Sequence, residues 1–432
     1  MNVLRRRYGD AFTVRVPLFG RTVVVSHPDL VKKVFQAKPD VLAFGVTSPL
    51  GRILGPGSLF SMDGETHLQE RRLILPAFHG ERMKSYEAII EQEARREMAS
   101  WPEDIDFRTL EPFMRITLNS ILRAVFGAEG ADVTELAEVL PEFVTLTSRL
   151  ALFPALQQDR GPFSPGRRFR RLRARYDSII DRMIDQHLAD RELEERADTM
   201  SLLLRAHYDD GSSMSRSAIA DELLTLLAAG HETTATSLAW AVDRLRRHPF
   251  ILRRVTQEAR EGGSTLRLAT ILEVQRTRPV IAGTGRHVLQ DFQLGPWQIP
   301  KGHHIYVSAS LIHNDPRFFE CPDRFEPDRF VDVKPETYTW VPFGGGTRRC
   351  PGAAFANMEM DIVLRTLLEQ FDLQPTAAPD EAWKDRGIAY APADGGRARV
   401  TRITAAPRSS QSEEPEPVAV VAGAAGAAGH RG

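Results

Sequence analysis

The feature that most restricts what this chain can fold into is the stretch over residues 343–352, where one cysteine follows a glycine-rich loop and two arginines. Glycines let a backbone approach a bulky partner closely and adopt positive φ angles. Pro351 suits the first position of a helix, where its missing N–H matters least. We therefore expect Cys350 at a helix N-terminus, where the dipole and free amides favour a thiolate. A buried free cysteine beside a tight turn is the alternative, but a thiolate metal ligand explains the whole stretch better.

Composition limits the class of protein. The 432 residues suffice for one large domain or two to three ordinary ones, and 42% hydrophobic with 26% charged residues is typical of a globular core. A net charge of -1 gives no general reason to expect nucleic acid or an anionic membrane as a partner. Cys321 and Cys350 cannot build a disulfide framework, which favours the cytoplasm. No apolar stretch near Met1 is long enough for a signal peptide or membrane anchor, so we expect a soluble protein.

The cysteine stretch also carries a resemblance to a known family. Phe343, Gly346, Arg348, Cys350 and Gly352 occupy every fixed position of the pattern Phe-x-x-Gly-x-Arg/His-x-Cys-x-Gly. The chain thereby resembles the cytochrome P-450 superfamily, in which a cysteine thiolate holds the iron of a haem b group. The resemblance implies that Cys350 is the axial ligand of the iron. The other loop residues that it places against the haem are Phe343, Gly344, Arg348 and Gly352.

A second informative stretch is the helical pattern over residues 215–247, which carries Ala-Gly-His-Glu-Thr-Thr in its middle. Gly230 should cost about 1 kcal/mol relative to alanine in a helix interior, and the Thr233 hydroxyl can donate to the Ala229 carbonyl. Close packing of another helix would explain the small residues alone. Together with Glu232, however, the segment is similar to the family motif on the distal side of the haem. The resemblance implies that Ala229 and Gly230 lie against the cofactor, that Thr233 hydrogen-bonds dioxygen and that Glu232 relays protons.

Basic residues in three separate segments match the haem-propionate contacts of the family. His67 and Arg71 are four residues apart and share one face of a predicted helix, although such a pair alone is usually solvated surface. The resemblance implies that both hold a propionate, whose carboxylate suits a guanidinium. Arg286, in a predicted extended segment, and Arg348, in the cysteine loop, are implied contacts of the same kind.

Three further charged residues match a structural motif of the family. Glu273 and Arg276 are three residues apart on one predicted helical face, a spacing that many exposed helices contain by chance. Arg329 lies in a later Phe-Glu-Pro-Asp-Arg-Phe segment. The resemblance implies a buried network of these three residues that braces the haem loop and has no catalytic part.

The resemblance implies a mainly α fold with small β-sheets: a single triangular-prism domain over residues 1–404, with the haem between the long central helix and the cysteine loop. Near the N-terminus, residues 12–26 are rich in side chains that favour β-strands, and this pattern predicts a β-hairpin. Pro141 and Pro154 are expected to limit the helix in an apolar stretch. Residues 405–432 are rich in Ser, Glu, Pro, Ala and Gly and predict a disordered tail.

An arginine-dense run covers residues 160–175. Such a run can indicate an anionic partner, but the solvated start of a long surface helix explains it more simply.

The activity implied by the resemblance is that of a haem-thiolate monooxygenase that consumes O2 and electrons from NAD(P)H. Because no flavin or iron–sulfur domain follows the haem fold, we expect ferredoxin and its reductase, or a flavodoxin-type donor, to dock near Cys350 and Arg349. A peroxide-driven peroxygenase and a non-catalytic haem-binding ligand carrier or sensor are the alternatives. The expected substrate is a hydrophobic small molecule such as a fatty acid, alkane, terpenoid or steroid. Candidate residues of its pocket are Phe44, Leu50, Phe153, Ile281, Ala282 and Ile388.

Overall fold

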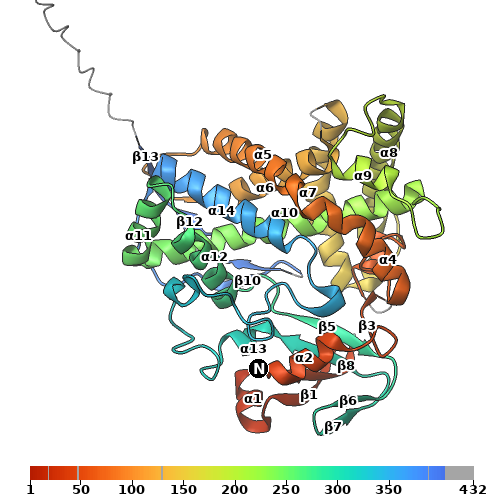
Figure 1. The fold of residues 1–432 in the computed structure, drawn as a ribbon, viewed down its shortest axis with the longest axis horizontal. Helices are drawn as coiled ribbons and strands as arrows, with labels where there is room; N and C mark the ends of the chain where they lie inside the picture. Colours follow the sequence, from red (N-terminus) through yellow and green to blue (C-terminus); the bar gives the residue numbers. More distant parts are fainter. Residues whose placement is uncertain (18, 46–47, 128–129, 388, 404–432) are drawn as a thin grey trace, which may run out of the picture.

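Helix α10 (Arg216–Arg247) runs through the middle of the computed structural model, and the other elements are arranged around it (Figure 1). Ser215 caps its first turn by accepting the N–H of Ala218 at 3.1 Å, and the helix ends just before Pro249, as the sequence predicts. The structure describes residues 1–17, 19–45, 48–127, 130–387 and 389–403.

The other α-helices are α1 (Asn2–Tyr8), α2 (Pro28–Gln36), α3 (Gly51–Leu54), α4 (Gly64–Ile74), α5 (Glu81–Met98), α6 (Leu110–Phe126), α7 (Ala131–Leu152), α8 (Pro165–Ala189), α9 (Thr199–Arg205), α11 (Pro249–Arg260), α12 (Thr265–Thr277), α13 (Ala309–His313) and α14 (Ala353–Gln370). Short 3₁₀ turns are η2 (Leu75–Phe78), η3 (Pro154–Gln157), η4 (Pro327–Phe330) and η5 (Gly346–Arg348). The strands are β1 (Ala11–Val16), β2 (Gly20–Val25), β3 (Leu42–Ala43), β4 (Phe107–Arg108), β5 (Gly283–Val288), β6 (Phe292–Leu294), β7 (Trp297–Ile299), β8 (His304–Ser308), β9 (Phe371–Leu373), β10 (Trp383–Asp385), β11 (Tyr390–Pro392), β12 (Arg397–Ala398) and β13 (Val400–Arg402).

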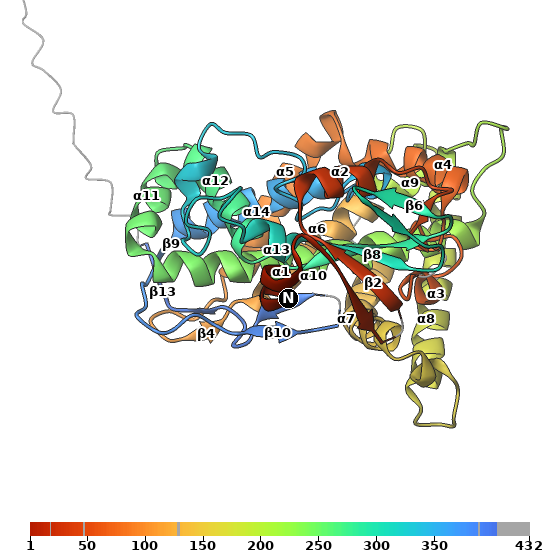
Figure 2. The same ribbon diagram turned by 90° about the horizontal axis from the view of Figure 1, so that it is seen from below.

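A five-stranded sheet lies beside the helices, with the strand order β1-β2-β8-β5-β3 (Figures 1 and 2). The predicted hairpin forms its β1–β2 part, and β8 pairs with β2 in parallel and with β5 in antiparallel orientation. Helix α2 covers the sheet with Val31 and Phe35, which share an apolar cluster with Val25 and Ile305. The N-terminal and C-terminal halves of the chain therefore build one layer together.

The largest apolar cluster surrounds α10. It joins residues of α5, α6, α8 and α14, and its fully buried members include Leu227 and Trp240 of α10, Phe113 of α6 and Val363 of α14. A helix that is covered on most of its faces in this way is held by tertiary packing rather than by helix propensity. The cost of Gly230 in its interior is therefore tolerated.

Two predicted helix boundaries, at Pro141 and at Pro351, are wrong. Helix α7 continues through Pro141, because Phe143 is fully buried against Phe169 and Tyr176 of α8, and this packing offsets the lost backbone hydrogen bond. Helix α8 starts at Pro165 and contains every arginine of the dense run except Arg160, so the run forms the start of a long helix as predicted. Helix α14 starts at Ala353 rather than at Pro351, which lies in a turn.

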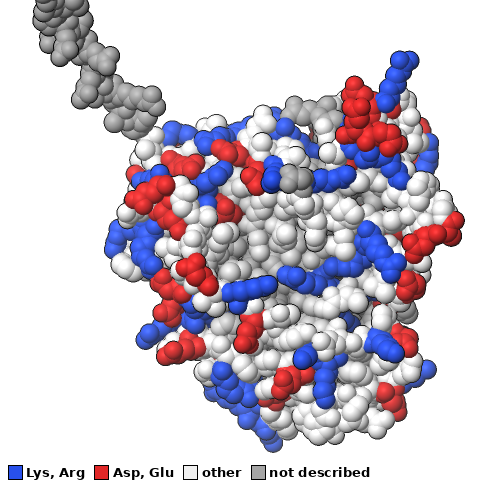
Figure 3. Space-filling model, viewed as in Figure 1, with Lys and Arg blue, Asp and Glu red and all other residues white. Residues whose placement is uncertain are grey.

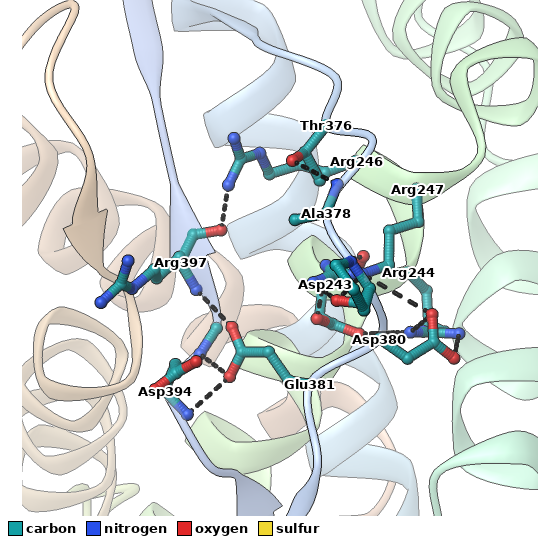
Figure 4. A network of polar contacts seen from close by, with 12 residues as sticks. Asp243, Arg244, Arg246, Arg247, Thr376, Ala378, Asp380, Glu381, Asp394 and Arg397 are labelled. Atoms are coloured by element: carbon teal, nitrogen blue, oxygen red, sulfur yellow. Dashed lines mark hydrogen bonds and ion pairs between the residues drawn. The ribbon is translucent and has the colours of Figure 1, made fainter.

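A polar network fixes the C-terminal end of α10 to the segment that follows β9 (Figure 4). Arg244 contacts Asp243 and Asp380 at 2.7 Å each, and Arg247 lies 2.6 Å from Asp243. Glu381 accepts backbone N–H groups of the turn between β11 and β12, at 2.8, 3.2 and 2.8 Å, from Asp394, Gly396 and Arg397. The β10–β11 hairpin is thereby anchored beside α10.

The predicted tail, residues 405–432, lies outside the described residues. Within the described part of the chain, none of the helices combines the length and the apolar character that crossing a bilayer requires.

Candidate active site

The loop before Cys350 has a closed shape that depends on its glycines. Cys350 donates its N–H to the Phe343 carbonyl at 3.0 Å, across the turn η5. Gly346 has a φ of 66°, and a Cβ on Gly345 or Gly346 would overlap Phe35 of α2. The glycines therefore permit a left-handed turn and a close approach of α2.

The Cys350 thiol is reached by water, yet the surrounding protein desolvates it enough to raise its pKa. The Gly352 N–H bonded to the sulfur and the nearby charges of Arg71 and Arg349 lower the pKa, but they do not outweigh desolvation. The expectation that the protein alone favours the thiolate is wrong because desolvation outweighs these contributions, and α14 begins only at Ala353, three residues after the cysteine. A metal cation would supply the missing stabilisation, since a coordinating thiol loses its proton.

The four residues predicted to contact propionates come together from α4, β5 and the cysteine loop. Desolvation and the charges of Arg348 and Arg71 lower the pKa of buried His67 to about 3. Burial and the charge of Arg348 lower the pKa of Arg286 to about 10. The carboxylate of Asp63, 2.5 Å from Arg348, offsets part of this positive charge. The cluster still carries excess positive charge in a desolvated place, which suits a further anionic group.

The arginines of this cluster also hold the chain around them. Arg348 donates to the Leu59 carbonyl at 2.9 Å and to the Met62 carbonyl. The ring of Phe44 lies 5.4 Å from the guanidinium carbon of Arg348 and 5.8 Å from that of Arg286. The structure thus places Phe44 beside the cationic cluster, and its part in a substrate pocket remains a prediction.

In the middle of α10 the predicted hydrogen bond is confirmed: the Thr233 hydroxyl donates to the Ala229 carbonyl at 2.8 Å. Ala229 is exposed, although most of the residues around it in α10 are buried. Gly230 instead faces α6, where an added Cβ would lie 3.5 Å from Ile121, an ordinary contact. Close helix packing therefore accounts for Gly230. Ala229 and Thr233 lie on the open side of the helix, where a ligand can approach.

Glu232 has a partner that sequence reasoning missed. Its Oε1 accepts from Nε of Arg386 at 2.8 Å, and both side chains are largely covered. Arg386 lies directly after β10, in the hairpin that the polar network of Figure 4 anchors beside α10. A separation of 154 residues leaves no local signal for this pair.

The predicted network of three charges is present. Glu273 and Arg276 are buried and make two contacts of 2.7 and 2.8 Å, and Arg329 lies 3.3 Å from Glu273. His313 links this network to the chain just before the cysteine loop: Nδ1 faces the Arg276 carbonyl at 3.1 Å, and Nε2 accepts the Val341 N–H at 3.0 Å. Burial and the Arg276 charge lower the pKa of His313 to about 3, so the neutral ring carries its hydrogen on Nδ1.

Comparison with known proteins decides the family. The family model described as "Cytochrome P450" matches residues 1–392. The chain belongs to the cytochrome P450 family. It is 51% identical over 398 residues to the Mycobacterium tuberculosis protein named "Putative cytochrome P450 138", covering 92% of this chain and 90% of that protein. It is 37% identical over 402 residues to "Putative cytochrome P450 137" of the same species, covering 92% and 84%.

Solved structures show the same fold. This cytochrome P450 superposes on "Retinoic acid bound cyanobacterial CYP120A1" with a TM-score of 0.82 at 23% identity, covering 93% of this chain and 94% of that one. The cytochrome P450DA haem domain matches with a TM-score of 0.79 at 22% identity, covering 93% and 92%. The predicted mainly α fold and the class of haem-dependent monooxygenase are thus confirmed. The Cys350 thiol fits the iron of a haem, and the desolvated Arg286 and Arg348 fit its two propionates.

The remaining pocket candidates lie in different places of the P450 fold. Leu50 packs between α3 and the α7–α8 pair, and Ile281 packs against the central cluster. The Ala282 carbonyl accepts the Ser310 N–H at 3.3 Å. Phe153 follows the end of α7 with 58% of its surface exposed. Ile388 lies outside the described residues. Their roles remain predictions.

Proposed function

We propose that this cytochrome P450 inserts one oxygen atom of O2 into a hydrophobic small molecule, with Cys350 as the axial haem ligand. The observation that supports this most is the cluster of buried His67 and Arg286 with half-buried Arg71 and Arg348 beside the Cys350 loop. When bound, the haem supplies the binding and reductive activation of dioxygen. We assign residues 1–404 to the haem domain and residues 405–432 to an appended tail.

The cationic cluster holds the cofactor by its two carboxylates. His67 and Arg71 approach from α4, Arg286 from β5, and Arg348 from the cysteine loop itself. Burial, and then the neighbouring positive charges, lower the pKa values of His67 and Arg286, and binding of the carboxylates would offset both effects. Phe343, Gly344 and Gly352 of the cysteine loop and Ala229 of α10 would line the haem, and Gly230 next to Ala229 allows α10 to pack closely on α6.

Removing one cation should weaken haem retention. We expect Arg286→Ala to raise the rate of haem loss about 10- to 100-fold, since one hydrogen bond to a charged group contributes about 1.5–3 kcal/mol. Transfer of haem to excess apomyoglobin measures this rate. Arg15→Ala, an exposed arginine of β1, is the control and should leave it unchanged. Equal rates for both variants would contradict the propionate role.

Proton delivery is assigned to α10. Thr233 keeps its hydroxyl on the helix by donating to Ala229, so its lone pairs face the open side and it can exchange this bond for one to dioxygen. Glu232 moves protons from solvent toward Thr233, and Arg386 positions its carboxylate between turnovers.

A Thr233→Ala variant tests the first step. It should keep binding substrate and consuming NAD(P)H, but the product formed per NAD(P)H should fall several-fold while hydrogen peroxide rises. Thr234→Ala is the matched control, because that hydroxyl donates to the Gly230 carbonyl and is buried on another face. Unchanged coupling in Thr233→Ala would exclude the role proposed for this hydroxyl.

A Glu232→Gln variant tests the second step. We expect kcat to fall about 100-fold, the usual contribution of a positioned acid–base group, with a larger solvent isotope effect. Arg386→Lys, which keeps a cation beside the carboxylate, should retain most of the rate. A Glu232→Gln enzyme with the original kcat and isotope effect would remove Glu232 from the relay.

Electrons are proposed to come from NAD(P)H through ferredoxin and ferredoxin reductase, or a flavodoxin-type donor, in the cytoplasm. Arg349 is exposed next to Cys350. On the face that carries α14 and α4, Lys and Arg side chains form a row across the middle (Figure 3), which suits an acidic redox protein. Product formation with peroxide alone, at the rate of the complete system, would favour a peroxygenase instead.

The proposed substrate class is a fatty acid, alkane, terpenoid or steroid-like molecule. Apolar candidates such as Leu50, Ile281 and Ala282 support a hydrophobic compound. Fatty acids, terpenoids and steroids should be screened for the low- to high-spin shift of the haem spectrum. Shifts produced only by hydrophilic compounds would contradict this class.

A further inference from the structure

Two histidines face each other across neighbouring strands of the five-stranded sheet. His287 of β5 and His304 of β8 are directly opposed in the antiparallel register, and the centroids of their rings lie 4.7 Å apart (Figure 1 shows the two strands side by side). Ile305 and Arg286, the neighbours of these histidines in the two strands, contact the cluster around α2 and its Phe35. Because side chains alternate along a strand, the two histidines lie on the other face of the sheet, away from the candidate active site.

The ring nitrogens of these histidines lack hydrogen-bond partners. Nδ1 of His287 and both ring nitrogens of His304 are buried, and none of the three forms a hydrogen bond to a described residue. The Phe19 carbonyl lies close enough to raise the pKa of His304, but not in the geometry of a hydrogen bond. Desolvation and the neighbouring His287 outweigh it and lower this pKa, so the neutral ring predominates at pH 7. Neutral imidazole is the form that binds metal ions.

A hydroxyl on the next strand is in the same situation. Thr22 of β2 is paired in register with His304, and its Oγ1 is buried without a hydrogen-bond partner in the described part of the chain. Buried polar atoms without partners are uncommon in native proteins, and each one calls for an explanation such as a bound water or ion. Here such atoms occupy adjacent positions on β2, β8 and β5. Their grouping indicates that a polar ligand belongs on this face of the sheet.

The distance between the two rings suits a shared metal ion. Imidazole nitrogens bind zinc at about 2.0–2.1 Å in tetrahedral geometry, which places the centroids of two coordinating rings about 5 Å apart. The observed 4.7 Å is close to this value. The rings can turn toward one ion without breaking a hydrogen bond to any described residue. No set of three or more histidine, cysteine and acidic side chains surrounds a metal position in the described ranges, so water has to complete the coordination.

We propose that His287 and His304 bind one divalent transition-metal ion of the zinc and copper class. Imidazole ligands select such ions over Mg²⁺ and Ca²⁺, which prefer oxygen. Water supplies the remaining ligands, and the Thr22 hydroxyl forms a hydrogen bond to one of these waters. The ion joins β5 to β8 on the face opposite α2. This inference goes beyond the proposed function and does not depend on the haem.

Calorimetric titration of Zn²⁺ into the full-length holoprotein tests the site. The protein carries no histidine tag, and it is treated with a chelator that is then removed. One ion should bind per chain, X-ray absorption at the zinc edge should show two imidazole ligands, and the melting temperature should rise because the ion binds only the folded state. Mg²⁺ should do none of this. Failure to bind zinc would leave water as the ligand and overturn the proposal, as would a bound zinc with fewer than two imidazoles.

Variants localise the site. His287→Gln and His304→Gln should each weaken zinc binding at least about 10-fold, since even the loss of a group behind a metal ligand costs 10- to 100-fold. His303→Gln is the matched control, because this neighbour of His304 points to the opposite face of the sheet. An unchanged haem spectrum shows that each variant is folded. Without zinc, all three should melt close to the wild type. Unchanged zinc affinity in His287→Gln and His304→Gln, or an equal loss in His303→Gln, would disprove the location.

Discussion

Replacement of Cys350 by serine should abolish the absorbance band that a thiolate-ligated haem shows when it is reduced under CO, together with monooxygenase activity. A hydroxyl remains protonated where a thiol is deprotonated by a metal, so serine cannot supply the strongly donating ligand. The fold should persist, because the bond from Cys350 to the Phe343 carbonyl uses a backbone N–H that serine keeps. Circular dichroism and the reduced-CO difference spectrum of the same sample provide the two measurements.

Cys321→Ser is the control for this experiment. Cys321 is exposed and lies in a turn outside the candidate site. Its replacement should leave the spectrum and the activity unchanged. A reduced-CO band of normal position in Cys350→Ser would show that another group ligates the iron, and the assignment of Cys350 would then fail.

The second large effect concerns stability. Glu273→Ala should lower the free energy of unfolding by about 3–5 kcal/mol, because it strands the buried charge of Arg276. It also removes the acceptor for the Glu326 N–H and the partner of Arg329. Urea denaturation of the purified protein measures the change. Loss of haem at lower urea than in the wild type would show that the network braces the cysteine loop, as His313 suggests.

The control is an ion pair in the same region but at the surface. Asp328 lies 2.7 Å from Arg254, and these side chains are 50% and 36% exposed, respectively. Asp328→Ala should therefore cost no more than about 1 kcal/mol. If Glu273→Ala and Asp328→Ala proved equally mild, burial would not be what makes the network of Glu273, Arg276 and Arg329 important.

Features that depend on neighbouring residues could be predicted from the sequence. The bond from Thr233 to Ala229 follows from helix geometry alone, and the boundaries of α10 follow from Ser215 and Pro249. The gathering of His67 with the three arginines was also expected, but only because the family pattern identified each of them.

Features that depend on distant residues could not be predicted. Arg386 meets Glu232 across 154 residues, and Asp63 meets Arg348 across 285. Neither pair leaves a periodic or local mark, because only the folded arrangement of helices and hairpins brings them together. Pro141 shows the opposite problem: a local rule predicted a helix end, but packing of α7 on α8 outweighed it.

The contact between Phe35 and the cysteine loop has a consequence for how the protein is made. Gly345 and Gly346 rest on Phe35, so the loop takes its shape from a helix synthesised about 310 residues earlier. At about 5–20 residues per second, a ribosome needs roughly 15–60 seconds to cover that distance. Throughout this interval the apolar side of α2 has only part of its final cover. Capture of the haem by Cys350 therefore cannot begin before this loop has been synthesised and has reached Phe35.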